Sequence, residues 1–573
     1  MDSHSDQEFA RLAGQYLGDR AERHPGAATE LGDHRFDSRL PDPSDEALAG
    51  ERQALDGWSR ALGALDVAAL DAQHQVDAAM MANDVARRVF ELDELREHIW
   101  NPLPANPGRA IYALLARDFA PLPDRLASVA GRLAEVPGVL TAARRRLGAM
   151  PRVHLETAIT QFSGTMSLVT TVIDAALRDV PGREADIAKV RPAALEALAG
   201  HRSWLSAQLD QAPGSGPGAG FAEPRIGAER FARKLSLTLD AQADADAILA
   251  RAHADLDRVS TQITELAAGL AAPGAGAARS PGAAAGRPAA DDGPVVRQVL
   301  DRLAADAPDD TSILPFGRRA MAAQTAFVRE NRLVTLFDDP VEVIEMPEID
   351  RGVAVAYCDS PGPLEAAPMP TFIAISPTPA GWPAARVTSF YREYNRHMVH
   401  NLMVHEAMPG HFVQLGHSRR FRGSATAIRA ALRSGSFVEG WAVYAEQVMA
   451  DHGYPGEGDP RAVRMQQLKM QLRMIINTIL DARVHGHGMT EAEAMALMTG
   501  RGYQEEGEAA GKWRRALLTS AQLSTYYVGY TEVADLAGEL RAAQPGQPVR
   551  DQHDRMLAHG SPPARLLRPL VGL

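Results

Sequence analysis

The chain has 573 residues, of which 45% are hydrophobic, 23% are charged and 6% are aromatic. This length allows either several domains or one large body, and the small aromatic share beside abundant alanine and leucine favours a helix-rich globular protein over a disordered one. The formal net charge of −12 argues against nucleic acid as a partner. The start of the chain has no targeting pattern and no later segment is long and apolar enough to span a bilayer, so we expect a cytoplasmic protein without membrane contact.

The first part of the chain, residues 1–270, has the apolar periodicity of packed helices. In one segment an apolar stripe recurs every three to four residues, formed by Leu249, Ala252, Leu256, Val259, Ile263 and Leu266. Residues 271–294 are rich in alanine, glycine and proline, which supply no core, so this stretch is expected to be a linker or solvent loop.

The second part, residues 295–573, begins with a β-like region and continues as helices. Four short segments near residues 332, 341, 352 and 371, "RLVTLF", "VEVIEM", "GVAVAY" and "TFIAIS", are rich in β-branched residues. Further on, Pro460 suits the first turn of a helix, and "TEAE" at 490–493 forms a capping box. The prediction is a mainly α protein with a small sheet near residues 332–376.

Histidines concentrate in one segment: five of the 18 lie between residues 397 and 417. His405 and Glu406 begin a His-Glu-x-x-His zinc pattern, but Pro409 stands where the second histidine should be and His411 comes two residues late. Because proline interrupts a helix and glycine permits unusual backbone angles, we expect a helix from about residue 391 to 408 to end at Pro409, with Gly410 allowing His411 to turn back toward His405. The other three histidines of the segment are expected to have structural or surface roles.

The segment "FVEGWAVYAE" at 437–446 supplies a carboxylate for the same site. Ser436 is the expected helix cap, and Glu439 lies among large apolar residues, where an unpaired carboxylate would be costly and a metal would relieve that cost. Glu439 is therefore the predicted third ligand, since catalytic zinc sites use three protein ligands. Glu446, two turns further on, could hold a ligand imidazole through its other nitrogen.

Taken alone, "HEAMPGH" has a second interpretation, in which His405 is a core histidine, Glu406 a surface acid and the Pro-Gly pair an ordinary helix end. The downstream "FVEGWAVYAE" favours the metal site over this interpretation. A carboxylate-bridged di-iron bundle is disfavoured because its Glu-x-x-His pairs are absent around these histidines.

The pair HEAMPGH and FVEGWAVYAE resembles the bacterial domain-of-unknown-function family eight-eight-five, which shares HExxPGH and EGWAxYxE and is similar to gluzincin zinc peptidases. "ATELGDHRFDSRLPD" at 28–42, "FGRRAMAAQTAFVRENRLVTLFDDP" at 316–340 and "QLSTYYVGY" at 522–530 extend this resemblance over nearly the whole chain. It therefore implies that residues 1–270 and 295–573 form one integrated fold, a helical body with a deep active-site cleft.

The resemblance also implies roles for individual residues. It makes His405, His411 and Glu439 the ligands of one Zn²⁺ ion and Glu406 the general base. It places an oxyanion-stabilising tyrosine at Tyr526, with the adjacent Tyr527 as a competitor, and makes His485 a candidate substrate contact.

The expected function is zinc-dependent hydrolysis of amide bonds in short peptides, with Glu406 accepting a proton from water and Tyr526 stabilising the oxyanion. The strand in "TFIAIS" or in "GVAVAY" could bind the peptide at a sheet edge. Two alternatives remain open: a metal-containing binding protein without hydrolysis, and a metalloenzyme acting on a non-peptide amide or a biosynthetic metabolite. The sequence leaves the oligomeric state and the exact substrate open.

Overall fold

The structure is a computed structural model that describes residues 4–180, 182–211, 220–241, 244–271, 293–347, 351 and 355–573. The chain is mainly helical with one small sheet, as predicted. It divides into two compact units: the first contains residues 1–226, 361–369 and 422–433, and the second contains residues 227–360, 370–421 and 434–573. Each unit is described by itself below.

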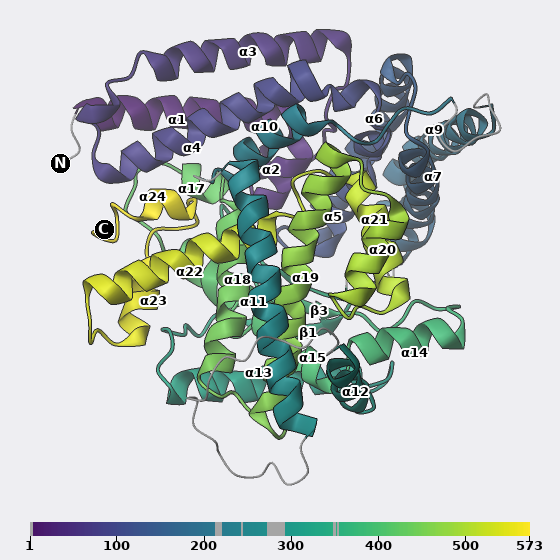
Figure 1. Ribbon diagram of the computed structural model, residues 1–573. Helices are drawn as coiled ribbons and strands as arrows, with labels where there is room; N and C mark the ends of the chain where they lie inside the picture. The colour runs from purple at the N-terminus through teal and green to yellow at the C-terminus, as the bar shows by residue number, and fades with distance from the viewer. Residues whose placement is uncertain are drawn as a thin grey trace. The chain divides into compact units, whose positions relative to one another are not determined.

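The first unit is entirely helical in its described part. Its α-helices are α1 (His4–Arg23), α2 (Pro25–Leu31), α3 (Asp45–Gly63), α4 (Ala72–Phe90), α5 (Gly108–Ala116), α6 (Leu122–Arg146), α7 (Arg152–Ser167), α8 (Ile173–Arg178), α9 (Glu184–Gln211) and α17 (Ile428–Ala431). α6 and α7 both pack on α9 and share one apolar core (Figure 1). α17 joins this unit through Arg429, whose Nε donates to the fully buried carboxylate of Asp77 on α4 at 2.7 Å.

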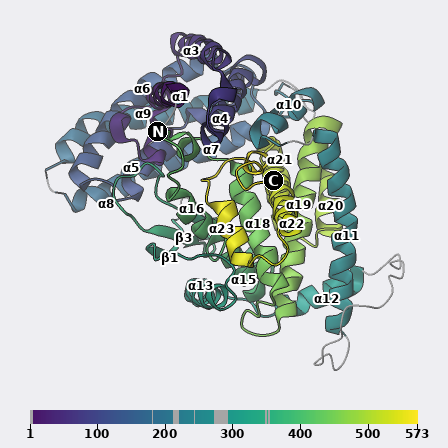
Figure 2. The same ribbon diagram turned by 90° about the vertical axis from the view of Figure 1, so that its left-hand side faces the viewer.

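The second unit holds the sheet and the remaining helices. These helices are α10 (Ala228–Leu239), α11 (Ala245–Ala271), α12 (Gly293–Ala304), α13 (Ile313–Glu330), α14 (Ala384–Glu393), α15 (Arg396–Glu406), α16 (His411–Arg419), α18 (Gly435–Asp451), α19 (Pro460–His487), α20 (Glu491–Gly500), α21 (Glu506–Leu518), α22 (Thr525–Ala543), α23 (Val549–Leu557) and α24 (Ala564–Leu567). The long α19 contacts α11 on one side and α18 on another, and α18 also packs along α22 (Figures 1 and 2).

Two predicted helix starts are confirmed in this unit. Pro460 occupies the first turn of α19, behind the cap Asp459, and Thr490 with Glu493 forms the capping box of α20. α11 buries the predicted stripe with a shift at its ends, since Ile248 and Ala267 are buried in place of Leu249 and Leu266.

The sheet has three short strands, β1 (Val341–Glu345), β2 (Ala356–Asp359) and β3 (Thr371–Ile375), in the order β1-β3-β2. β1 pairs with β3 in parallel and β2 pairs with β3 antiparallel. Because β3 lies between its two neighbours, "TFIAIS" is not a sheet edge, and that half of the peptide-binding prediction is wrong. Residues 352–354 of "GVAVAY" lie outside the described residues, and binding along that segment stays a prediction.

The segment "RLVTLF" at 332–337 is not a strand. Side chains take the place of a neighbouring strand there: Asp554 accepts from the Thr335 backbone N–H at 2.8 Å, and His417 Nε2 lies 2.8 Å from the Thr335 carbonyl oxygen. His553 Nδ1 lies 2.7 Å from the Leu333 carbonyl oxygen. The apolar pattern correctly predicted burial, since Leu333 and Val334 are buried. It does not show which groups form the hydrogen bonds with the backbone.

The linker expected at 271–294 falls on residues 272–292, which lie outside the described residues, so this boundary stays a prediction. In the compact units, α10 and α11 group with the later part of the chain, where α11 packs on α19. Across the described ranges, no helix combines the length and the apolarity needed to cross a bilayer.

Candidate metal centre

The histidine segment contains the predicted break. α15 ends at Glu406 and α16 begins at His411. The predicted start near residue 391 is wrong, because α14 ends at Glu393 and Asn395 caps a new helix by accepting from the Met398 N–H at 3.2 Å. The Met408–Pro409 peptide bond is cis.

Gly410 is required by space rather than by a left-handed backbone. Its φ is −73°, which is not left-handed. A Cβ atom at this position would lie 1.9 Å from the His405 carbonyl oxygen and 2.5 Å from that of Val404, and the Gly410 N–H donates to the Val404 carbonyl oxygen at 3.0 Å. The chain thus folds back so tightly onto the end of α15 that only glycine fits.

This turn brings His411 to His405. The two imidazole ring centroids lie 4.6 Å apart with their planes at 86°, which confirms the predicted approach. Oε2 of Glu439, from α18, lies 3.3 Å from His405 Nε2 and 3.4 Å from His411 Nε2. This oxygen is buried and has no hydrogen-bond partner among the described residues.

These spacings fit a zinc ion. Two ligand atoms bound tetrahedrally at about 2.1 Å from a metal lie about 3.4 Å from each other. The candidate ligand atoms of His405, His411 and Glu439 all lie within 4.8 Å of one another. Two imidazoles and one carboxylate are the ligand set of a catalytic zinc site that keeps one position open.

Close helix packing sets the position of Glu439. Where α18 crosses α22, a Cβ on Gly440 would lie 2.2 Å from the backbone of Gly529, and a Cβ on Gly529 would lie 1.9 Å from the Ser436 carbonyl oxygen. Trp441 Nε1 donates to the Pro409 carbonyl oxygen at 2.9 Å, which ties α18 to the turn before His411. The predicted cap of α18 is wrong by two residues, because Ser434 accepts from the Phe437 N–H.

A buried carboxylate orients His405. Glu446 Oε1 lies 2.8 Å from His405 Nδ1, and Asn401 Nδ2 donates to Glu446 Oε2 at 2.6 Å. With Nδ1 bound to Glu446, His405 presents Nε2 to Glu439, as a metal-binding histidine does. His411 has no equivalent support in the described part of the chain, where its buried Nδ1 makes no hydrogen bond.

The charges of these groups depend on one another. Burial alone would lower the pKa of the His405 imidazole, but the adjacent carboxylates of Glu439 and Glu446 hold it well above its usual value. Burial alone would raise the pKa of the Glu439 carboxyl, but His411 and His405 hold it well below its usual range. Without a metal, a proton therefore neutralises the cluster, and a divalent cation would replace that proton.

Glu406 lies beside the cluster on the last turn of α15. It is buried, and burial raises its pKa, while the backbone N–H of Cys358 on β2 donates to it and partly offsets that rise. His405, His411 and Glu439 all interact electrostatically with this carboxyl. A carboxyl with a raised pKa next to a metal ligand set can accept a proton from water.

The two tyrosines point to different partners. Glu439 is the largest influence on the Tyr526 hydroxyl and, with burial, raises its pKa, while Arg515 lowers it; His405 also interacts with this hydroxyl. Tyr527 instead donates to Asp255 Oδ2 on α11 at 2.7 Å. Of the two, Tyr526 is the one placed beside the ligand set.

His485 packs against the end of another helix. Its Nε2 lies 2.9 Å from the carbonyl oxygens of both Ala516 and Thr519, and its ring stacks on Phe231 at 5.7 Å between centroids. Only 3% of the residue is exposed. This burial does not favour the predicted substrate contact, and it gives His485 a part in holding the chain after α21.

Two further histidines of the 397–417 segment have the structural roles expected of them. His400 Nδ1 lies 3.0 Å from the Tyr454 hydroxyl, and His417 binds the Thr335 carbonyl oxygen as described above.

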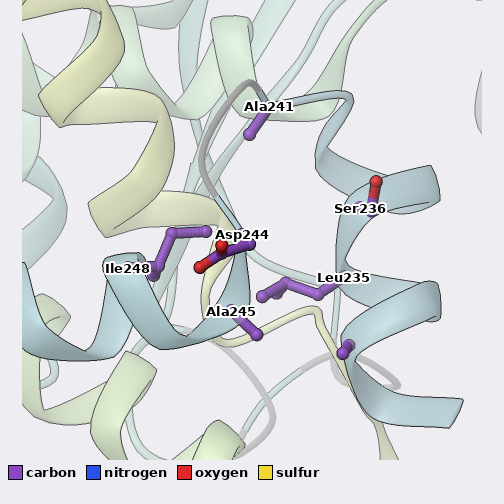
Figure 3. A pocket seen from close by; sticks show the side chains of 7 residues that line it. Leu235, Ser236, Ala241, Asp244, Ala245 and Ile248 are labelled. Carbon is purple, nitrogen blue, oxygen red and sulfur yellow. The ribbon is translucent and has the colours of Figure 1, made fainter. Parts of the chain in front are cut away.

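Two other places in the molecule have features of a site. In the first unit, Asp6, Asp71 and His74 come close together, but the carboxylates are engaged with backbone: Asp71 caps α4 and Asp6 accepts from the Asp71 N–H at 3.0 Å. A hollow of about 180 Å³ lies between α10 and α11 and is lined by Leu235, Asp244, Ile248 and their neighbours (Figure 3). It contains none of the predicted site residues, and the cleft implied by the resemblance stays a prediction.

Sequence reasoning missed several residues of this site. Nothing in the sequence indicated that Trp441 binds the Pro409 carbonyl, that Asn401 supports Glu446 or that Arg515 lies beside Tyr526. A four-residue spacing did exist for Asn401 and His405, one turn apart on α15, and it could have shown that both side chains reach the same carboxylate.

Comparison with known proteins identifies relatives of unknown function. The sequence model of one family, described as bacterial protein of unknown function (DUF885), matches residues 25–571. The chain is similar to the solved structure of "a putative lipoprotein of unknown function" from Shewanella oneidensis, with 28% identity and a TM-score of 0.81 over 98% of this chain and 99% of that one. A "putative lipoprotein" from Colwellia psychrerythraea has the same fold, with 17% identity and a TM-score of 0.79 over 99% and 98% of the two chains. No curated protein matches the chain.

These relatives correct the expected location. Both solved structures carry the description "putative lipoprotein", which contradicts the cytoplasmic location predicted from the sequence. That prediction was wrong because it rested only on absences, the lack of a targeting pattern at the start of the chain and of a long apolar segment later.

Proposed function

The chain belongs to the bacterial family of unknown function DUF885, and on that premise we propose that it is a zinc-dependent hydrolase that cleaves amide bonds of short peptides. The observation that carries the proposal is the environment of Glu439 Oε2. This buried oxygen makes no hydrogen bond within the described residues and lies 3.3 and 3.4 Å from the two imidazole nitrogens of His405 and His411. The resemblance to gluzincin peptidases adds the expectation that the substrate is a peptide.

The ligand set would be His405, His411 and Glu439, holding one zinc ion. When bound, zinc supplies Lewis acidity, which polarises a substrate carbonyl and makes water more acidic. Glu446 keeps His405 in the orientation that this set requires, through its 2.8 Å contact with Nδ1.

Glu406 and Tyr526 would carry the proton transfer and the charge stabilisation. The Glu406 carboxylate accepts a proton from the attacking water and passes it to the leaving amine nitrogen. The Tyr526 hydroxyl, which stays protonated because Glu439 and burial raise its pKa, donates a hydrogen bond to the carbonyl oxygen as negative charge develops.

The test is a comparison of the zinc-loaded wild type with Glu406→Gln on a library of short peptides, read by mass spectrometry. We expect the wild type to cleave peptides and Glu406→Gln to retain zinc but lose at least about 100-fold in rate, because the amide cannot accept the proton. Glu491→Gln, at an exposed position on α20, serves as the matched control and should cleave normally. Zinc-loaded protein that cleaves no peptide would refute the proposal and leave a binding protein or an enzyme of non-peptide amides.

A further inference from the structure

A stripe of polar side chains runs along α19. Lys469, Arg473, Asn477, Asp481 and His485 recur every four residues, so each lies beside the next and together they form a face that turns gradually round the helix. Four of them are at most 6% exposed as whole residues, and the Arg473 side chain is 12% exposed. Such a face is uncommon inside a protein, because buried charges need partners.

The C-terminal end of the stripe, at Asp481, holds the segment that leads to Tyr526. Asp481 accepts from the backbone N–H groups of Ala521 and Ser524, both at 3.1 Å, and from the Ser524 hydroxyl at 2.8 Å. These hydrogen bonds fix the segment between α21 and α22, so the end of α21 and the start of α22 are positioned together.

The N-terminal end of the stripe, at Lys469 and Arg473, lies in surroundings with more positive than negative charge. We call Lys469, Arg473, Lys512 and Arg515 the cationic cluster; the first two come from α19 and the others from α21. Lys469 Nζ lies 2.9 Å from Glu393 Oε2 on α14, Arg473 lies 3.8 Å from the other oxygen of the same carboxylate, and Arg473 is also paired with Glu508 on α21. Only Lys469 and Arg473 of these four basic residues are thus paired with the two carboxylates.

Lys512 and Arg515 are the two cations left over. Within the described residues, neither forms an ion pair with a carboxylate within 4.0 Å, and Lys512 is only 6% exposed. Burial, with Arg473 next in effect, lowers the pKa of Lys512 to about 7, and Arg515 adds to the decrease. The amine is therefore only partly protonated near neutral pH, and an anion bound beside it would favour its charged form.

The surplus charge lies next to the candidate active site. Arg515 lies close enough to interact with the Tyr526 hydroxyl, and the same hydroxyl is influenced most by the metal ligand Glu439. A substrate whose carbonyl reaches Tyr526 would therefore bring its neighbouring groups to Arg515, and Lys512 lies one turn before Arg515 on α21. A guanidinium binds a carboxylate through two parallel hydrogen bonds, which suits Arg515 to this task.

We propose that Arg515, supported by Lys512, binds a carboxylate of the substrate, so that the substrates are peptides with a free carboxylate close to the scissile amide. This inference rests on the proposed function for the location of the scissile amide. The carboxylate can come from the C-terminus of the peptide or from an acidic side chain, and the experiment separates these sources.

The test measures binding to the metal-free, full-length protein by calorimetry, because a carboxylate could also bind zinc directly. The ligands are N-acetyl-Ala-Ala, its C-terminal amide, and N-acetyl-Ala-Asp amide. We expect the amide without a carboxylate to bind at least about tenfold more weakly than one of the two acids, as the loss of a charge-assisted hydrogen bond predicts. The tighter acid identifies the source of the carboxylate.

Substitutions on α21 test which residue causes the preference for a carboxylate. Arg515→Gln should remove it, Arg515→Lys should retain part of it, and Arg514→Gln, at an exposed position on the same helix, should leave it unchanged. Circular dichroism establishes that each variant is folded. Equal binding of acids and amide by the wild type, no binding of either acid, or an unchanged preference in folded Arg515→Gln would overturn the inference.

This outcome is separable from that of the proposed function. A carboxylate preference in a protein that cleaves no peptide would refute only the hydrolysis. Peptide cleavage without any carboxylate preference would refute only the role of Arg515 and Lys512.

Discussion

Replacing Gly410 by alanine tests how His411 reaches the metal centre. The added Cβ would lie 1.9 Å from the His405 carbonyl oxygen, whereas real Cβ contacts are not shorter than about 3.0 Å, so the turn must open by at least about 1.1 Å. Zinc ligand distances tolerate only about 0.2 Å. Because the turn joins His405 to His411, the opening would separate the two ligands by several times that tolerance.

We expect Gly410→Ala to weaken zinc binding by at least about 100-fold, measured by competition with a chromogenic chelator, while the helical content stays that of the wild type. Gly435→Ala is the matched control, since it lies at the start of α18 and its Cβ would come no closer than 4.0 Å to another group. If Gly410→Ala binds zinc within twofold of the wild type, the steric account of the turn is refuted.

Three further predictions concern the surroundings of the site and the stability of the first unit. Tyr526→Phe should lower kcat by about 100-fold or more, whereas Tyr527→Phe should lower only stability, because its hydroxyl donates to Asp255. Glu446→Gln should weaken zinc binding by about tenfold, measured with the same chelator, because the orientation of His405 is lost. Buried Asp84 has its pKa lowered to about 2, since the Arg87 and Arg20 guanidiniums outweigh its burial; it therefore stabilises the first unit above about pH 4, and this stability is lost as the pH falls toward 2. Asp84→Asn should cost about 2 kcal/mol at pH 7 and flatten that pH dependence, measured by hydrogen exchange of α4.

Each of these expectations has a result that would contradict it. Equal kcat values for the two tyrosine variants would mean that Tyr526 does not contact the reacting carbonyl. A zinc affinity unchanged in Glu446→Gln would show that His405 needs no support, and an unchanged acid dependence in Asp84→Asn would assign that stability to other groups.

The clustering of His405, His411 and Glu439 could be predicted from the sequence because its signals are local. His405, Glu406 and His411 lie in one heptapeptide, and a carboxylate at Glu439 between Phe437 and Trp441 is chemically conspicuous. Two residues one turn apart on a helix, or two turns apart in the case of Glu439 and Glu446, can be placed relative to each other by helix geometry alone.

Other features could not be predicted because they depend on contacts between distant segments. "RLVTLF" has the composition of a strand, but its backbone binds Asp554, His417 and His553 from later parts of the chain. His485 has no local feature that distinguishes a buried histidine from one that contacts substrate.

The glycine at 410 shows the same limit. The sequence indicated that glycine was needed for unusual backbone angles, but it did not indicate the close approach to the carbonyl oxygens of residues five and six positions earlier. The surplus of positive charge at Lys512 and Arg515 could not be predicted either, because it depends on how α19 and α21 pack together and on which basic side chains then pair with a carboxylate.

The central claim is that His405, His411 and Glu439 together bind zinc, and the metal content of the purified protein tests it most directly. Elemental analysis after exchange into zinc and removal of loosely bound metal should give one zinc ion per chain in the wild type, and almost none in His411→Ala or Glu439→Ala, with absorption spectra of the zinc edge showing nitrogen and oxygen ligands at about 2.0–2.2 Å. Wild-type protein without stoichiometric metal, or variants that keep it, would contradict the account.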